Sequence, residues 1–308
     1  MCLNTLYQNY NLTKDSAIIT WICQDESIFL FDFLYDKCNL SKKTVQTAMK
    51  NRNIKLNNKR IRKNKTIIKG DIISLNLLFE SKVTVPQNFM KLEIIYEDEH
   101  ILAISKPSNI NMYPSSKVTS NTLANQISYY FECNNIPFKV RFINRLDRDT
   151  SGIVLIAKNP YAHQQYSKQF EDNTIEKYYL CICEGNHNYT KGSFTSSLES
   201  KEKLKKCITN YKLISKNNNL SFFKVKLITG RTHQIRKHFS ENNIPLLGDS
   251  LYNIDSNLIV DRQMLHAYKC SFKNIVTLEN IEIISEIPND FKKNLKMNCL
   301  DTSNFVVL

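Results

Sequence analysis

The sequence predicts an α+β protein with a large domain built around a mostly antiparallel mixed sheet, preceded by a small α+β unit. From residue 92 onward, short apolar runs with strand-like alternation dominate, and helical spacings are interspersed among them. A compact segment near the amino terminus has helices and strands of its own. The length of 308 residues exceeds a usual single domain, and 42% hydrophobic residues are enough for a core.

The amino-terminal unit begins with two short predicted helices. Apolar residues of "SIFLFDFLY" recur at helical spacing, and Ser41 can cap a second helix that runs through Met49. Ile54 and Leu56 alternate with polar residues before an Asn-Asn turn, and the run after Gly70 is typical of a closing strand. We therefore divide the chain into an extension (1–26), this unit (27–80), a linker (81–91) and the large domain (92–308).

The large domain contains strands of two kinds and at least one well-marked helix. "LEIIYEDEHILAISKP" predicts two strands around a charged turn, and "NLSFFKVKLITG" predicts an alternating strand that ends in a turn. "GIVLIAK" is a short continuous apolar run, which is typical of a fully buried strand. A helix is expected from Pro160 to Phe170, because Asn159 can cap it and Pro suits its first turn.

Composition and cysteine spacing exclude several classes of protein. No uncharged apolar run could span a bilayer, and the amino terminus lacks the pattern of a signal or transit peptide, so we expect a cytoplasmic protein. Nine scattered cysteines include no C-x-x-C pair, and Cys181 and Cys183 have strand spacing that predicts packing on one face. His233 and His238 miss the i, i+4 spacing of a helical zinc pair, so we expect no metal.

Positive charge is concentrated in the amino-terminal unit, which resembles the small S-four-like RNA-binding domain named after a ribosomal small-subunit protein. The chain has a net charge of +13, and a basic cluster neutralises phosphates and gains affinity by releasing counterions. A solvated surface in a Lys-biased proteome is the alternative. We expect RNA contacts from Lys42, Lys43, Arg52 and Arg60. The whole cluster comprises these four together with Lys50, Lys55, Lys59, Arg62, Lys63 and Lys65.

Three stretches of the large domain carry the residues suited to chemistry. They are "RLDRDTSGIVLIAK" from Arg145, "GRTHQIRKHFSENNIPLLGDSLY" from Gly230 and "RQMLHAYKCSF" from Arg262. Their order and spacing are similar to the signature segments of the RluA-type pseudouridine synthases, and the similarity runs from about Leu92 to Pro288. The sister RsuA-type family resembles the chain in overall fold but has N-R-Q-V-R in place of "THQIR", which favours the RluA type.

The resemblance implies an isomerase that converts uridine within RNA to pseudouridine. Such enzymes break the bond from base to sugar, rotate the uracil and rejoin it through carbon 5. No cofactor is implied. Together with the basic unit, the resemblance predicts a monomer that acts on ribosomal RNA, with transfer RNA as the second choice.

The resemblance also assigns catalytic roles to three residues. Asp147 is the catalytic carboxylate, Arg236 is its cationic partner and Tyr179 lies against the flipped base. A nucleophilic carboxylate must be ionised although a dry pocket raises its pKa, and an Arg cannot lose its charge there. For Tyr179 the alternative role is that of a core aromatic, while Tyr178 should point to the opposite face of the strand.

Further residues of these stretches are expected to bind RNA. Arg145 is implied to fill the space that the flipped uridine vacates, since a planar guanidinium stacks on bases. Arg231 and His233 are expected to contact RNA from the second stretch. The charged residues before "GIVLIA" indicate that a buried strand acts as a rigid mount for Arg145 and Asp147, with Gly152 shaping the entry into that strand.

Two segments depart from the family's pattern. Asn144 stands where the family usually has His before R-L-D, and Asn109 and Tyr113 stand where it usually has Gly and His after Lys106 and Pro107. Because Asn tolerates left-handed backbone, Asn109 can keep the turn. Tyr113 and Asn144 are expected on different elements of one site, so an altered target preference or a weakened activity stays open.

Three alternative functions stay open. An RNA-binding protein without catalysis could serve ribosome assembly, but a dry pocket has no reason to keep Asp147 together with its counter-charge Arg236. A hydrolase with paired carboxylates would need Asp149 to act beside Asp147. A nucleoside hydrolase acting on free nucleosides would have no use for the basic unit.

Overall fold

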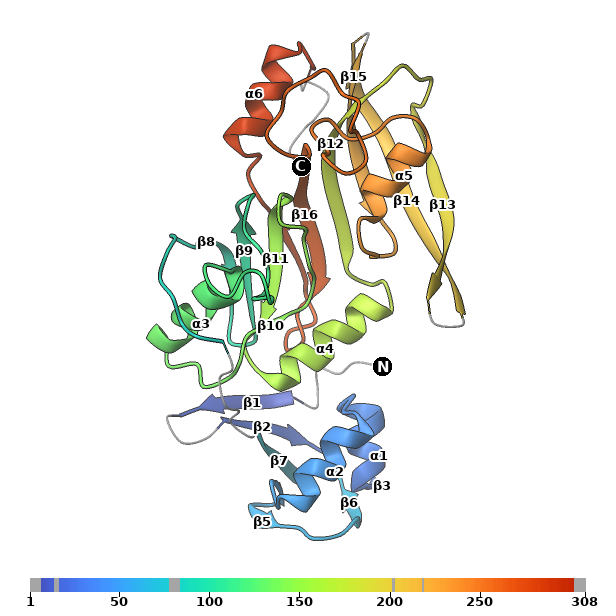
Figure 1. The fold of residues 1–308 in the computed structure, drawn as a ribbon. Coiled ribbons are helices and arrows are strands. Elements are labelled where there is room, and N and C mark those ends of the chain that lie inside the picture. Colours follow the sequence, from blue (N-terminus) through green and yellow to red (C-terminus); the bar gives the residue numbers. More distant parts are fainter. Residues whose placement is uncertain (1–6, 14–16, 78–83, 201–202, 218, 302–308) are drawn as a thin grey trace.

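The structure is a computed structural model, and it describes residues 7–13, 17–77, 84–200, 203–217 and 219–301. It confirms the α+β class, with a small sheet near the amino terminus and a large sheet in the rest of the chain (Figure 1). Within these ranges, no helix combines the length and apolarity that a membrane crossing requires.

The small sheet is antiparallel, with strands in the order β1-β2-β7-β4-β5. Its strands are β1 (Tyr7–Leu12), β2 (Ala17–Ile22), β4 (Ile54–Leu56), β5 (Lys59–Arg60) and β7 (Ile72–Leu77). A two-stranded ribbon lies beside it, formed by β3 (Ser27–Phe29) and β6 (Thr66–Ile68). The helical elements are α1 (Leu30–Asp32), the π-helix η2 (Phe33–Lys37) and α2 (Lys42–Lys50).

Local sequence signals account for this unit. The Ser41 hydroxyl accepts from the backbone N–H of Thr44 at 3.1 Å and caps α2 as predicted. Asn57 and Asn58 have positive φ angles of 48° and 65°, which closes the tight turn between β4 and β5. Strands β1 and β2 lie in the predicted extension, yet β2 pairs with β7, so extension and unit share one sheet.

The amino-terminal unit packs against helix α4 (Pro160–Glu171) of the large domain (Figure 1). The Gln164 side-chain amide donates to the carbonyl of Asn39 at 2.6 Å. The Trp21 and Tyr161 rings meet edge to face with centroids 5.8 Å apart. One apolar core therefore continues through both parts of the chain.

The predicted linker is fixed on helix α3 (Leu123–Cys133) from residue 84 onward, while its first three residues lie outside the described ranges. The Asn125 side-chain amide donates to the Val85 carbonyl at 2.8 Å, and the Gln126 side-chain oxygen accepts from the Phe89 N–H at 2.9 Å. Side chains of α3 thus satisfy the backbone of a segment that has no strand partner.

The large sheet has ten strands, with the main order β13-β14-β15-β12-β16-β11-β9-β8. Beyond this path, β10 pairs with β11 and β17 pairs with β16. Its strands are β8 (Glu93–Glu97), β9 (Ile101–Lys106), β10 (Arg141–Phe142), β11 (Ser151–Ala157), β12 (Glu176–Glu184), β13 (Lys191–Ser200), β14 (Lys203–Lys216), β15 (Leu220–Leu227), β16 (Leu265–Lys273) and β17 (Asn280–Ile284). Helices α5 (Gln234–Glu241) and α6 (Asn289–Met297) complete the domain.

The predicted buried strand lies in the middle of this sheet. Every residue of β11 is buried, and β11 runs parallel to β16 although its other partners are antiparallel to it. At the entry to β11, Gly152 has a φ of +113°, and a Cβ there would lie 2.2 Å from the carbonyl oxygen of Ala267. Only glycine allows the two strands to approach this closely, as the predicted sharp entry requires.

The other local predictions also agree with the structure. The Asn159 side chain accepts from the Ala162 N–H at 2.8 Å and caps α4, which ends one residue beyond the predicted Phe170. Cys181 and Cys183 are buried on one face, with their sulfur atoms 3.7 Å apart and no disulfide between them. Both act as core filler.

Candidate active site

A cavity of about 280 Å³ opens where the loop before β11, strand β12 and the start of α5 meet. The predicted site residues that line it are Arg145, Asp147, Tyr179, Arg231, His233 and Arg236. A larger cavity of about 680 Å³ lies between α4, β16 and β17, and none of the predicted site residues lines it. The predicted site residues therefore gather at the smaller cavity.

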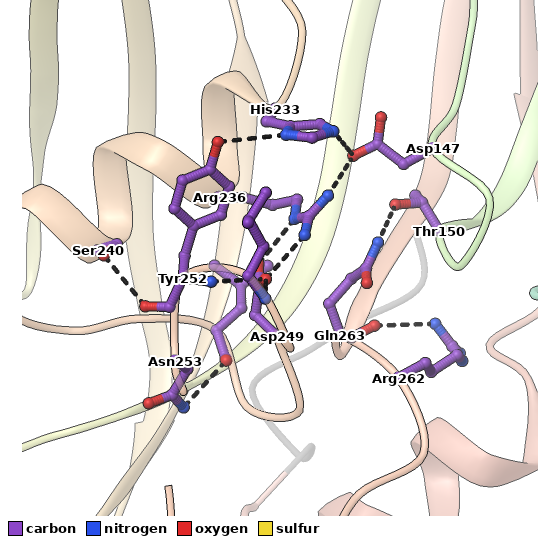
Figure 2. A network of polar contacts seen from close by, with 12 residues as sticks. Asp147, Thr150, His233, Arg236, Ser240, Asp249, Tyr252, Asn253, Arg262 and Gln263 are labelled. Carbon is purple, nitrogen blue, oxygen red and sulfur yellow. Dashed lines mark hydrogen bonds and ion pairs between the residues drawn. The ribbon is translucent and has the colours of Figure 1, made fainter. Parts of the chain in front are cut away.

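Asp147 is held in the turn that joins β10 to β11. The Thr150 N–H donates to the Asp147 carbonyl at 3.2 Å, which fixes the backbone. The carboxylate oxygen Oδ2 accepts from Arg236 Nη1 at 3.1 Å and lies 3.7 Å from His233 Nε2 (Figure 2). Within the part of the chain that the structure describes, Oδ1 has no protein partner. One oxygen of the carboxylate is anchored and the other is available for reaction.

Arg236 is buried between two carboxylates. Its Nε and Nη2 atoms donate to Asp249 Oδ2 and Oδ1, each at 2.7 Å, and its Nη1 atom reaches Asp147 (Figure 2). Burial alone would lower the pKa of the guanidinium, but Asp249 and Asp147 outweigh it and raise the pKa. The bidentate pair sets the plane of the guanidinium, so its remaining edge points at Asp147.

Asp249 is the site residue that the sequence analysis did not identify. Its side chain is fully buried, and Oδ1 also accepts from the N–H groups of Leu251 and Tyr252 at 3.0 and 3.1 Å. The preceding Gly248 has a φ of +74°, and a Cβ there would lie 2.1 Å from the Arg262 carbonyl oxygen. A sequence signal was present: a glycine followed by an acid within the stretch that supplies Arg236.

His233 lies beside the carboxylate in the wall of the cavity. It precedes α5 with a φ of 54°, an unusual backbone for a residue other than glycine. Its Nδ1 atom lies 3.2 Å from the Tyr252 hydroxyl, which orients Nε2 toward Asp147 (Figure 2). Arg145 and Arg231 are exposed at the edge of the cavity.

Tyr179 lies in the cavity wall and in the core at the same time, so both predicted roles fit its position. The side chain is buried, and burial, with the negative charge of Asp147 adding to it, raises the pKa of its phenol. The ring is therefore neutral at ordinary pH. Tyr178 lies on the opposite face as predicted, with Lys224 Nζ 5.1 Å from its ring centroid.

A buried lysine, Lys106, links the turn that carries Asp147 to a second loop. Lys106 is fully buried, and its Nζ donates to the carbonyls of Pro107, Ile110 and Arg148 at 2.8, 3.0 and 2.9 Å. Burial lowers the pKa of Lys106 to about 7. Because Arg148 directly follows Asp147, these bonds position the catalytic turn.

The departures from the family's pattern have separate structural consequences. Asn109 has a φ of 63° and accepts a hydrogen bond from the Arg148 guanidinium, so it keeps the turn as expected. The Asn144 amide lines the cavity and bonds to β11, accepting from Leu155 N–H at 2.8 Å. Tyr113 packs on Phe142 and is not among the residues that line the cavity, whereas Asn144 is, so their expected place in one site stays a prediction.

The same geometry bears on the alternative of a hydrolase with paired carboxylates. Asp149 is absent from the cavity lining and faces Arg148 at 3.8 Å, so it does not form a carboxylate pair with Asp147. Among the described lining residues, Asp147 is the only acid, because Asp249 is enclosed behind Arg236. The cavity therefore lacks the second carboxylate that a hydrolase of this type would use.

The basic residues of the amino-terminal unit are arranged differently. Lys42, Lys43, Arg52 and Arg60 are all exposed, and none of them has an acidic partner within the described ranges. Their positive charge is therefore available to an external anion.

Comparison with known proteins identifies the family. Residues 100–241 match the family model described as RNA pseudouridylate synthase. The chain is 34% identical over 276 residues to YhcT of Bacillus subtilis, an RNA pseudouridine synthase described as uncharacterized, with 86% of this chain and 91% of that protein covered. The chain belongs to the RNA pseudouridylate synthase family. It is an isomerase that converts uridine in RNA to pseudouridine.

Other relatives agree with this assignment. Ribosomal large subunit pseudouridine synthase D of Borreliella burgdorferi is 32% identical over 273 residues, covering 80% of this chain and 83% of that protein. The enzyme of the same name from Zymomonas mobilis is 30% identical over 242 residues, covering 71% and 76%. The solved structure of human RNA Pseudouridylate Synthase Domain Containing 4 has a TM-score of 0.58 at 18% identity, covering 68% of this chain and 94% of that one, and confirms the fold.

Proposed function

We propose that this pseudouridine synthase isomerises specific uridines in structured ribosomal RNA, with Asp147 as the nucleophile and the target base flipped into the cavity. The observation that carries the proposal is the half-anchored carboxylate, since Arg236 holds Oδ2 and leaves Oδ1 without a partner among the described residues. Two relatives bear names that refer to the large ribosomal subunit, which supports ribosomal RNA as the substrate.

The bonds and protons of the proposed isomerisation balance without a further reactant. Asp147 Oδ1 bonds to C1′ of the ribose while the bond from C1′ to N1 breaks, and the electron pair leaves with the uracil. After the uracil rotates, C5 bonds to C1′ as the bond to Asp147 breaks. C5 loses its proton and N1 gains one, so product and substrate have the same composition.

Arg236 keeps the nucleophile charged in a cavity that would otherwise favour its neutral form. Its guanidinium cannot deprotonate, and the buried Asp249 holds it in place. Tyr179 takes part as a neutral phenol that packs against the base. The fixed guanidinium of Arg236 and the flat ring of Tyr179 allow the uracil to rotate without leaving the cavity.

The target must leave its stack before C1′ can reach Asp147, at a cost of a few kcal/mol. Arg145 lies two residues before Asp147 and is exposed at the edge of the cavity, where its guanidinium can stack in the vacated space. The exposed basic residues of the amino-terminal unit supply phosphate contacts that offset this cost.

The direct test replaces the nucleophile. Ribosomal RNA transcribed with [5-³H]uridine should release tritium on each turnover, because the new bond forms at C5. Asp147→Asn should lower the single-turnover rate at least about 10³-fold while RNA affinity stays within a few fold, since phosphates supply most of the binding. Asp149→Asn is the matched control and should keep its rate. Comparable rates for Asp147→Asn and the unchanged enzyme would contradict the mechanism.

A competing function is an RNA-binding protein without catalysis that serves ribosome assembly. The ordered chain of Asp147, Arg236 and Asp249 argues against it, because burying the charges of Arg236 and Asp249 beside a partly exposed carboxylate costs free energy that RNA binding alone does not require. Mapping pseudouridines across total RNA from a strain that lacks the gene would identify the modified uridines.

A further inference from the structure

Lys177 is a buried cation in the same cavity to which the reaction assigns no role. It is on β12, two residues before Tyr179, and its side chain points to the same face of the strand. The residue is 5% exposed and lines the cavity. Its Nζ atom is fully enclosed and has no hydrogen-bond partner among the residues that the structure describes.

The described surroundings of Lys177 contain no counter-ion. Its Nζ lies 4.1 Å from the centroid of the Phe170 ring, and Leu227 lines the same part of the cavity. Cys270 is its register partner on β16, but burial raises the pKa of that thiol to about 12, so it stays uncharged. Burial also lowers the pKa of Lys177 itself.

Burying the Lys177 ammonium group costs free energy unless a ligand supplies an acceptor for it. An ammonium group removed from water loses its hydration, and a ring face returns only part of that free energy. Other enclosed cations of the site have their acceptors: Arg236 has two carboxylates and Lys106 has three carbonyls. Among these three cations, Lys177 alone lines the cavity without an acceptor among the described residues.

The occupant under the proposed function is a uracil ring, which carries two carbonyl oxygens. When the bond from N1 to C1′ breaks, the electron pair remains on the base and spreads over N1 and both oxygens. We infer that Lys177 Nζ binds a carbonyl oxygen of the uracil and stabilises the negative charge that develops there. This inference rests on the proposed function and adds a second charged group of the same cavity to it.

The first test uses Lys177→Met, which keeps the length of the side chain and removes the charge. The single-turnover rate of tritium release should fall about a hundredfold or more, as when one preorganised donor to a developing charge is removed. The melting temperature should rise, because an unpaired buried cation is removed. A structural role predicts the opposite sign: a lower melting temperature with a rate close to normal. That result would overturn the inference.

Lys224→Met is the matched control, because Lys224 lies on the neighbouring strand β15 but packs over Tyr178 on the other face of the sheet. It removes the same charge from the same sheet and should leave the saturating rate unchanged. An equal loss of rate in both variants would indicate a general charge effect and would reject a specific role for Lys177.

The second test separates the base from the phosphates. The probe is a short oligocytidylate with one central uridine, compared with the same RNA carrying an abasic residue there. Lys177→Met should weaken binding of the uridine probe severalfold and leave the abasic probe unchanged. Equal weakening of both would indicate a phosphate contact and overturn the inference. If the unchanged enzyme releases no tritium from ribosomal RNA, the proposed function fails, but this difference in affinity still decides whether Lys177 binds the base.

Discussion

The cavity and the amino-terminal unit use positive charge in opposite ways. Arg236 in the cavity wall and Lys106 beneath the turn that carries Asp147 are buried, and each bonds to fixed acceptors. In the amino-terminal unit, residues such as Arg52 and Arg60 are exposed and face solvent. Buried charges have strong, directional interactions that salt barely screens, whereas exposed ones act through a field that salt weakens. We therefore expect the cavity to determine the chemistry and the amino-terminal unit to determine capture of RNA.

The largest expected effect comes from breaking the buried pair behind the nucleophile. Asp249→Asn removes the charge that fixes Arg236 and leaves a buried guanidinium with one carboxylate partner. We expect a loss of about 3–5 kcal/mol in the free energy of unfolding and a fall in kcat of about a hundredfold or more. Chemical denaturation and single-turnover tritium release measure the two effects. A variant with normal stability and rate would show that Asp249 does not hold Arg236.

A smaller effect is expected at Lys106. Lys106→Met leaves three buried carbonyls without their donor and should lower the free energy of unfolding by about 2 kcal/mol at neutral pH. Because burial lowers the pKa of Lys106 to about 7, the unfolded chain binds more protons than the folded one from pH 7 to about 10. The free energy of unfolding of the unchanged protein should therefore rise with pH over this window. The difference in this free energy between the unchanged protein and Lys106→Met should widen.

Denaturation curves at several pH values test this sign. If the difference in free energy of unfolding between the two proteins stays constant from pH 7 to about 10, the three carbonyl acceptors keep Lys106 as an ammonium ion in the folded state. In either outcome the variant reports on the link between Lys106 and the turn that follows Asp147.

The smallest effect is expected at the exposed charges. The double variant Arg52→Gln and Arg60→Gln should leave the saturating rate unchanged and weaken RNA binding mainly at low salt. The slope of log affinity against log salt should fall by about one for each phosphate that the variant no longer neutralises. Lys69→Gln is the control, since Lys69 already faces Glu26 at 3.4 Å. Equal slopes for the double variant and the unchanged protein would show that Arg52 and Arg60 do not contribute to RNA capture.

Substitution is a cleaner test of this unit than deletion. Removing the unit together with the extension would expose Tyr161, which packs on Trp21, and His100, whose ring centroid lies 4.8 Å from that of Tyr10. Loss of this shared core would lower stability and obscure any effect on RNA binding.

The sequence by itself determined the local structure and predicted the candidate reactive groups. Periodicity and capping residues such as Ser41 and Asn159 predicted the strands and helices, because these signals act over a few neighbouring residues. The stretches that carry Asp147 and Arg236 indicated the family. The two residues are 89 positions apart in the chain, and their juxtaposition followed from the resemblance and not from spacing.

Only the tertiary structure decided which buried charges have partners. The Gly-Asp pair at Asp249 gives no sign by itself that this acid fixes Arg236 and not another group. Nothing in "EKYYLCICEG" shows that Lys177 has no acceptor among the described residues. The pairing of β2 with β7 and the position of Tyr113 outside the cavity also depend on how distant elements pack. Burial and pairing are properties of the space around a side chain, and residues that are remote in the chain supply that space.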